Sequence, residues 1–308
     1  MSRRAGFLQR TGAVLKLAIP ATAELLLNMV VDMVNTYLVG HLGAAPLAAV
    51  GLGVQGAAIG SLAGRLAGGL LVVVLLLRGR SGLALRLRGW RIDPALIWRM
   101  LRIGLPAGLD QLIFRLGMLV FVRMVAALGT AAYAAHQVAL SAESLSFMPG
   151  FGFAVAATTL VGQGLGARDE QRAEQDGFAA FCLAAGLMSV MGLGFILFAE
   201  DLVGIFTTDA QVIALGITPL RLIGLVQPFL AAMMVFAGGL RGAGDTVAPL
   251  LINASAVWLV RVPAALLLTQ VVEWELTGAW IAMALDLVVR GGLLFTRFRS
   301  GQWKRARV

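Results

Sequence analysis

The feature that most constrains this chain is a series of apolar runs long enough to cross a lipid bilayer, which takes about 20 helical residues. We predict about eight such spans, at 15–40, 54–77, 103–128, 131–162, 177–199, 212–238, 247–270 and 276–296. Only 13% of the residues are charged and 59% are hydrophobic, which leaves too little polar surface for a water-facing fold. The sequence therefore predicts an all-α integral membrane protein.

The fourth predicted span is unusually long and contains Pro149-Gly150. Proline interrupts the hydrogen bonding of a helix. We therefore expect this span to be broken there, with part of it at the membrane interface.

The basic residues are segregated along the chain. The gaps at 41–45, 129–131, 200–211 and 271–275 contain no Lys or Arg, whereas the other gaps and both ends are rich in Arg. By the positive-inside rule, both termini and the basic segment 81–102 are expected on the cytoplasmic side. The net charge of +9 is therefore explained by the orientation of the chain in the membrane, and it does not indicate nucleic-acid binding. The preference for Arg over Lys suggests a bacterial source, and hence a multi-pass protein of the inner (plasma) membrane.

The chain contains an internal repeat at a shift of 86 positions. Pro20 then aligns with Pro106, and Glu24 with Asp110. The match stops near Gln55, and the segment after it resembles the last span. We therefore predict a shortened first part of two helices at 1–80, with a deletion near 54–60. A basic linker at 81–102, a six-helix lobe at 103–297 and a basic tail at 298–308 follow.

Four segments carry a family resemblance: Asp32–Gly43, Leu128-Gly129 with Ala134–Gln137, Leu160–Arg168, and Leu240–Thr246. In order and position they resemble motifs of the multidrug and toxic-compound extrusion (MATE) transporters. The resemblance implies an antiporter that expels cationic or amphipathic compounds, built from two six-helix lobes. Here it implies one complete lobe and two helices of a truncated first lobe.

The resemblance also bears on the coupling ion. In the proton-coupled branches, a first-helix acid implicated in coupling matches Asp32. The acids of the sodium-coupled branch align near Phe114 and Leu230, which are apolar. This favours H⁺ over Na⁺, and no cofactor is expected.

An ionisable side chain inside a membrane span is a functional hypothesis by default. Asp32 lies in the first span, with Asn28 four residues earlier on the same face and Glu24 before it. We assign these three residues to proton coupling or to the substrate cavity. The alternative for Asp32 is a carboxylate that pairs with an arginine elsewhere in the bundle.

A second polar group lies in the fourth span and consists of His136, Gln137, Glu143 and Ser144. His136 and Glu143 are seven residues apart, on nearly the same helix face. The group is either a polar wall of the solute cavity or an interhelical hydrogen-bond cluster, and the sequence leaves both open.

Other charged residues in the spans are expected to form structural ion pairs. Asp286 and Arg290 are four residues apart and are expected to pair. Arg115 is expected to pair with Asp110 or with an acid on a neighbouring helix. Arg65, Arg221 and Arg261 receive no role.

The lone Cys182 is expected in the core. It excludes a disulfide framework, and no metal-ligand or nucleophile spacing appears. An enzyme is therefore not expected.

Two alternatives to an active exporter remain at this point. One is a transport-inactive remnant that inserts through its complete lobe, and the other is a lipid flippase. The expected partners are the bilayer and small organic or cationic solutes. A homodimer that completes the missing lobe stays open.

Overall fold

The computed structural model describes residues 11–19, 22, 70, 74 and 94–305. The chain divides into two compact units, one made of Met1–Glu24 with Arg99–Val308 and the other of Leu25–Trp98. The fold below is that of the first unit. Most of the first two predicted spans, the junction near 54–60 and most of the linker at 81–102 lie outside the described residues.

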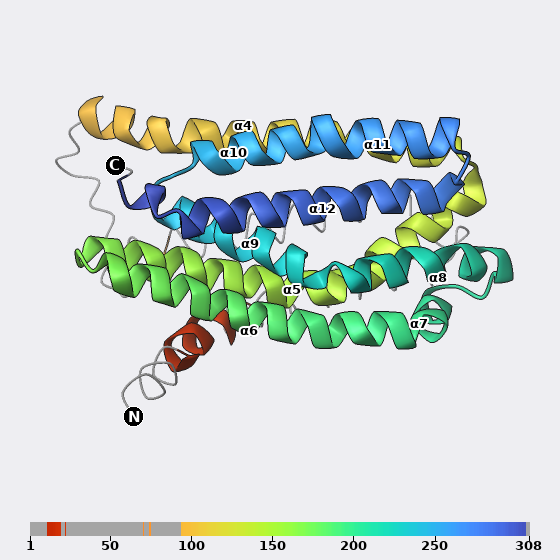
Figure 1. Cartoon of the computed structure of the whole chain (residues 1–308), viewed down its shortest axis with the longest axis horizontal. Coiled ribbons are helices and arrows are strands. Elements are labelled where there is room, and N and C mark those ends of the chain that lie inside the picture. Colours follow the sequence, from red (N-terminus) through yellow and green to blue (C-terminus); the bar gives the residue numbers. More distant parts are fainter. Residues whose placement is uncertain (1–10, 20–21, 23–69, 71–73, 75–93, 306–308) are drawn as a thin grey trace. The chain divides into compact units, whose positions relative to one another are not determined.

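Every regular element of the described residues is a helix (Figure 1). In chain order these elements are α4 (Pro94–Ala127), α5 (Thr130–Gly166), α6 (Glu170–Leu197), α7 (Ala199–Phe206), α8 (Ala210–Leu225), α9 (Gln227–Gly242), α10 (Val247–Ser255), the π-helical η1 (Ala256–Arg261), α11 (Val262–Leu266), the π-helical η2 (Leu267–Val271), α12 (Glu275–Arg299) and the 3₁₀ turn η3 (Gln302–Arg305).

Five helical segments of the described part are long and apolar enough to cross a membrane: 104–127, 130–166, 170–197, 247–271 and 275–299. The helices α8 and α9 form a sixth if they count as one span, bent by 56° at Val226. Pro228, in the first turn of α9, cannot donate a backbone hydrogen bond back across this break. The predicted spans from residue 103 onward each fall on one of these segments. The total of eight spans and the two-lobe arrangement stay predictions.

The expected break in the fourth span is wrong, because α5 continues through Pro149 to Gly166. Pro149 and Gly150 are both buried, so this part of α5 lies inside the bundle, and a location of part of the span at the membrane interface stays a prediction. A Cβ atom on Gly150 would come within 3 Å of the sulfur atoms of Met188 and Met234. Packing against α6 and α9 thus supports the helix directly after the proline.

Helices α5 and α9 approach each other through small residues. A Cβ atom on Gly238 would lie 2.5 Å from the carbonyl oxygen of Ala154, and one on Gly242 would lie 2.2 Å from that of Thr158. Both pairs repeat every four residues, so two small faces meet along the helices. This close backbone approach is typical of helices that associate inside a membrane.

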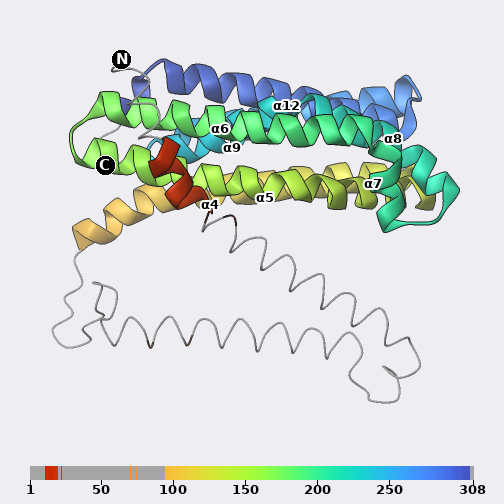
Figure 2. The same cartoon turned by 90° about the horizontal axis from the view of Figure 1, so that it is seen from below.

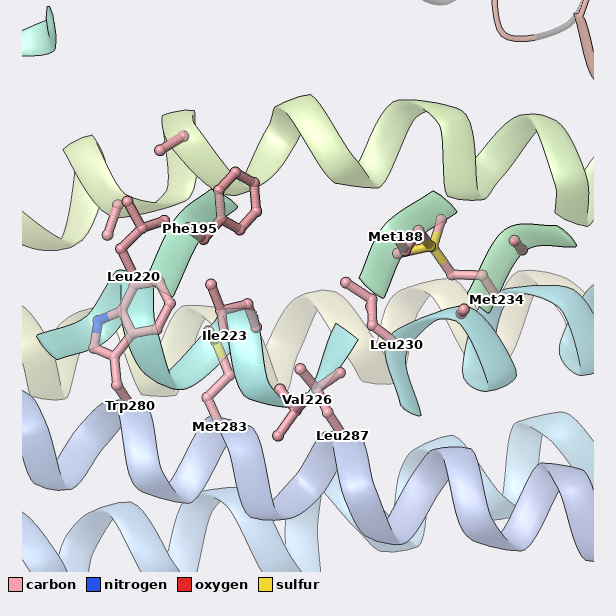
Figure 3. Close-up of a cluster of buried hydrophobic side chains, with 14 of the residues drawn as sticks. Met188, Phe195, Leu220, Ile223, Val226, Leu230, Met234, Trp280, Met283 and Leu287 are labelled. Carbon is pink, nitrogen blue, oxygen red and sulfur yellow. The ribbon is translucent and has the colours of Figure 1, made fainter. Parts of the chain in front are cut away.

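The apolar interior lies between α5, α6, α8, α9 and α12. In Figure 3, Trp280 and Met283 of α12 point toward Leu220 and Ile223 of α8, and Leu287 lies beside Val226. Figure 2 shows the molecule turned by 90°, and both views place α5 and α6 side by side. The helical segment 11–19 belongs to this unit and adds Val14 and Ala18 to the core.

The end of the chain packs back onto the helices. The ring of Trp303 in η3 stacks on Phe298 of α12 at a centroid distance of 4.8 Å, and its Nε1–H donates to the Phe298 carbonyl. Lys304 forms an ion pair with Glu174 of α6. The segment predicted as a basic tail is therefore folded at least as far as Arg305.

Candidate functional site

A cluster of charged side chains lies buried between α4, η1 and α12. The Nη2 atom of Arg261 lies 2.6 Å from Oδ2 of Asp286, and Arg290 pairs with the same carboxylate. The exposed fractions of these three side chains are at most 4%. The predicted Asp286–Arg290 pair is confirmed, and Arg261 is an addition that the sequence reasoning missed.

The position of Arg261 depends on the π-helical turn η1, which ends at this residue. Pro263 follows two residues later; it has no N–H, and its ring would clash with the carbonyl of Leu259 in a regular α-helix. A widened turn is one way to accommodate such a proline, and π turns are frequent at functional sites. The only signal in the sequence was an arginine two residues before a proline within an apolar run.

Helix α4 covers this cluster with three side chains on one face, at i, i+4 and i+7. Arg261 lies over the ring of Phe121, and Arg290 over that of Phe114, at 5.6 and 5.5 Å from the centroids. Met118 between them accepts from Nη1 of Arg261 at 3.4 Å. A guanidinium over an aromatic face gains about 2 kcal/mol when it is desolvated. The aromatic rings thus stabilise both cations where water is excluded.

His136 and Glu143 of α5 are buried near this cluster. The His136 ring contacts Phe121 and Trp280 edge to face, at 5.9 and 5.5 Å, and neither ring nitrogen has a hydrogen-bond partner among the described residues. The Glu143 carboxylate likewise has no hydrogen bond or ion pair there. The guanidinium of Arg261 is the charged group whose field reaches both. Among the described residues these two therefore form no hydrogen-bond cluster, and the cavity wall stays a prediction.

The other two residues of the predicted polar group point elsewhere. Gln137 is exposed, and the Ser144 hydroxyl donates to the Ser141 carbonyl of its own helix at 2.6 Å. Consecutive helix residues point about 100° apart, so Gln137 cannot share the face of His136. The interhelical hydrogen bond that does form was not predicted: Nε2 of Gln227 donates to Oγ of Ser146 at 2.9 Å.

The expected pairing of Asp110 with Arg115 is wrong. Asp110 accepts from Nη2 of Arg241 at 2.8 Å and from Nδ2 of Asn253 at 2.9 Å. Arg115 is exposed and has no ion pair with any described residue. Residues five apart lie on different faces of a helix, whereas Arg241 and Asn253 approach from α9 and α10.

The segment Leu240–Thr246 connects α9 to α10, and its two charged residues both form ion pairs. Arg241 holds Asp110 of α4, and Asp245 holds Arg297 of α12 at 2.8 Å. The charges of this motif therefore anchor the connection to two neighbouring helices.

Three of the predicted site residues, Glu24, Asn28 and Asp32, lie outside the described residues, as does Arg65. Cys182 is exposed on α6 and does not lie in the core as expected. A cysteine side chain is small and tolerates apolar surroundings, so it fits both the core and an exposed helix face. The residue type therefore could not tell these two locations apart. Phe114 and Leu230 are described; the first lies under Arg290, and the second is fully buried.

Comparison with known proteins gives a consistent result. Residues 106–267 match the MatE family. The chain is 35% identical over 262 residues to the probable multidrug resistance protein NorM of Thermotoga maritima. This alignment covers 83% of this chain and 55% of that protein. It is 32% identical over 271 residues to the probable NorM of Brucella suis, with 86% and 56% covered. The chain thus spans about half the length of these curated relatives.

Solved structures resemble the same part of the chain. An outward-facing multidrug resistance MATE transporter of the MOP superfamily superposes with a TM-score of 0.75 at 22% identity, over 82% of this chain and 57% of that one. A MOP superfamily transporter from Pyrococcus furiosus superposes with a TM-score of 0.73 at 22% identity, over 82% and 57%. At this level of identity the likeness concerns the fold.

Proposed function

Because the chain belongs to the MATE family of transporters, we propose that it is a secondary active antiporter that exports small organic or cationic compounds. We propose H⁺ as the coupling ion in preference to Na⁺. The chain then works as a multi-pass protein of a bacterial inner membrane.

The observation that carries this proposal is the state of Glu143. It is a buried carboxylate within a helix long and apolar enough to span a membrane, and no described group pairs with it. A membrane protein rarely keeps such a residue for stability alone. A carboxyl group in this place can bind and release a proton while the helices around it repack. Asp32, which matches the first-helix acid of the family, is the second candidate for this role.

The preference for H⁺ is supported by the two positions where the family resemblance puts the sodium-coupling acids. Phe114 packs its ring under a guanidinium, and Leu230 is buried in the apolar core. Neither side chain offers an oxygen ligand, and Na⁺, like other hard cations, is bound by oxygen atoms.

The test is efflux from proteoliposomes that contain the purified chain. A fluorescent organic cation is loaded inside, and an inward H⁺ gradient is imposed with and without a protonophore. We expect efflux that requires the gradient and that does not respond to Na⁺. Asp32→Asn and Glu143→Gln keep side-chain shape but remove titration, so the more damaging change identifies the coupling residue. Arg221→Gln, which removes an exposed charge on α8, is the matched control.

Two outcomes would contradict parts of the proposal. Efflux driven by Na⁺ and indifferent to H⁺ would reject the coupling ion. No efflux from folded, correctly inserted protein would reject transport by this chain and favour the inactive remnant.

A further inference from the structure

The buried cluster around Asp286 has an unequal charge balance. Arg261 and Arg290 both pair with the one carboxylate of Asp286, so the three side chains together carry one surplus positive charge. Their exposed fractions are at most 4%, so water cannot screen this charge effectively. A buried surplus charge of this kind requires a compensating negative group nearby.

Next to this charge lie N–H donors with no acceptor among the described residues. These are Nε of Arg261 and Nε1 of Trp280, and a neutral His136 adds one further ring N–H in either tautomer. All three side chains are more than nine-tenths buried. The His136 ring contacts Trp280 and Phe121, and Arg261 lies over the same Phe121 ring, so the three residues are linked through these rings. An unmade hydrogen bond of a buried donor costs about 1–3 kcal/mol, so these donors favour a ligand that accepts.

The nearest negative group is Glu143, but it does not occupy the donors. Its carboxylate feels the charge of Arg261 without a hydrogen bond or ion pair to it. Among the described residues, the other charged groups near this place are Asp286 and Arg290 of α12, which pair with each other, and Asp110 of α4, whose charge reaches Arg290. Helix α4 presents Met118 and Phe121 here. An ionised Glu143 balances the surplus charge and competes with an external anion, whereas a protonated Glu143 leaves the surplus charge to that anion.

We propose that Arg261, His136 and Trp280 form a binding site for one small monovalent anion, either an inorganic halide or the carboxylate group of a solute. The anion accepts the N–H donors and neutralises the surplus charge of the cluster. Glu143 weakens its binding by repulsion. The site adds anions to the cationic compounds of the proposed function. Its test does not depend on transport, because anion binding is measured without an ion gradient.

The experiment uses the full chain, purified in detergent in sodium cyclohexanesulfonate, whose bulky anion is neither a halide nor a carboxylate. Chloride, bromide or acetate replaces the sulfonate at constant ionic strength. The thermal unfolding midpoint is followed against anion concentration, since a ligand of the native state raises it in a saturable manner. Broadening of the ³⁵Cl resonance reports chloride binding independently. Saturation by chloride and bromide alone identifies a halide site, and saturation by acetate as well identifies one that accepts carboxylates.

The variants separate the site from general charge effects. Glu143→Gln removes the competing charge, and we expect it to tighten anion binding roughly tenfold. Arg261→Gln is expected to abolish saturation, and its Asp286 keeps Arg290 as a partner. Trp280→Phe keeps the ring and removes one donor, so we expect binding several-fold weaker. Arg221→Gln is the control and should bind like the unmodified protein.

The proposal is overturned if neither the unmodified chain nor Glu143→Gln shows saturable anion dependence. It is also overturned if Arg261→Gln responds to chloride like Arg221→Gln. If Arg261→Gln does not fold, the test rests on Glu143→Gln, which is expected to tighten anion binding, and Trp280→Phe, which is expected to weaken it. Equal anion affinities of these two variants would reject the site.

Discussion

Arg261 and Asp286 come from different helical segments, and their Nη2 and Oδ2 atoms lie 2.6 Å apart in the buried part of the lobe. The pair ties the π-helical turn η1 to α12, and Arg290 approaches the same carboxylate from one helical turn further along. One acid thus serves two cations from two elements. We expect removal of the acid to have a larger effect than removal of either cation, because it leaves both guanidiniums without this partner.

The first prediction concerns this acid. Asp286→Asn is expected to lower the free energy of unfolding by about 3–5 kcal/mol, because it leaves buried charges uncompensated. Thermal unfolding of the purified protein in detergent measures the loss. Asp201→Asn, which removes an exposed acid on α7, should leave the midpoint unchanged. Equal midpoints for the two variants would show that the cluster contributes nothing to stability.

The second prediction concerns the contact between α5 and α9. A methyl group on Gly238 would lie 2.5 Å from the carbonyl oxygen of Ala154, so the two backbones must separate in Gly238→Ala. We expect a loss of about 1–3 kcal/mol. Gly186→Ala is the matched control, since no atom lies within 4 Å of its added methyl group. It should be neutral, or more stable by up to about 1 kcal/mol through helix propensity. The reverse ranking in thermal unfolding would contradict the packing described here.

The third prediction concerns the C-terminal turn. Trp303 is fully buried, stacks on Phe298 and donates its N–H to a backbone carbonyl. Trp303→Ala should lower the free energy of unfolding by about 3–5 kcal/mol, as large aromatic truncations in a core do. Limited proteolysis should then cut the end of the chain faster. Trp274→Ala, at a half-exposed tryptophan, should change neither measurement; if both variants behave alike, η3 is not part of the folded core.

The fourth prediction is the orientation in the membrane. Thr208 lies between α7 and α8, and Ser300 follows α12; both are exposed. In a Cys182→Ala background, a membrane-impermeant maleimide should label Thr208→Cys on intact cells. It should label Ser300→Cys only after permeabilisation, because the basic segments are expected inside. Labelling of Ser300→Cys on intact cells would reverse the topology.

The sequence indicated correctly those features that depend on neighbouring residues alone. The segments long and apolar enough to cross a membrane in the described part match the predicted ones, because hydropathy sums along the chain. The Asp286–Arg290 pair was also predictable, because helix geometry brings residues four apart together. The orientation and the coupling role of Asp32 remain predictions that rest on the same kind of local information.

The sequence by itself therefore determined that this protein is a helical membrane protein of the MATE type. Tertiary structure alone decided which polar residues meet. Asp110 pairs with Arg241 from another helix, Gln227 bonds to Ser146, and Arg261 reaches Asp286 through a π-helical turn. The position of each of these partners depends on how two helices are rotated and how they cross. Close contacts between helix backbones, such as that of Gly238 with Ala154, help to determine both the rotation and the crossing. Periodicity within one helix contains no information on the face that another helix presents to it, so these pairs appear only once the helices are packed.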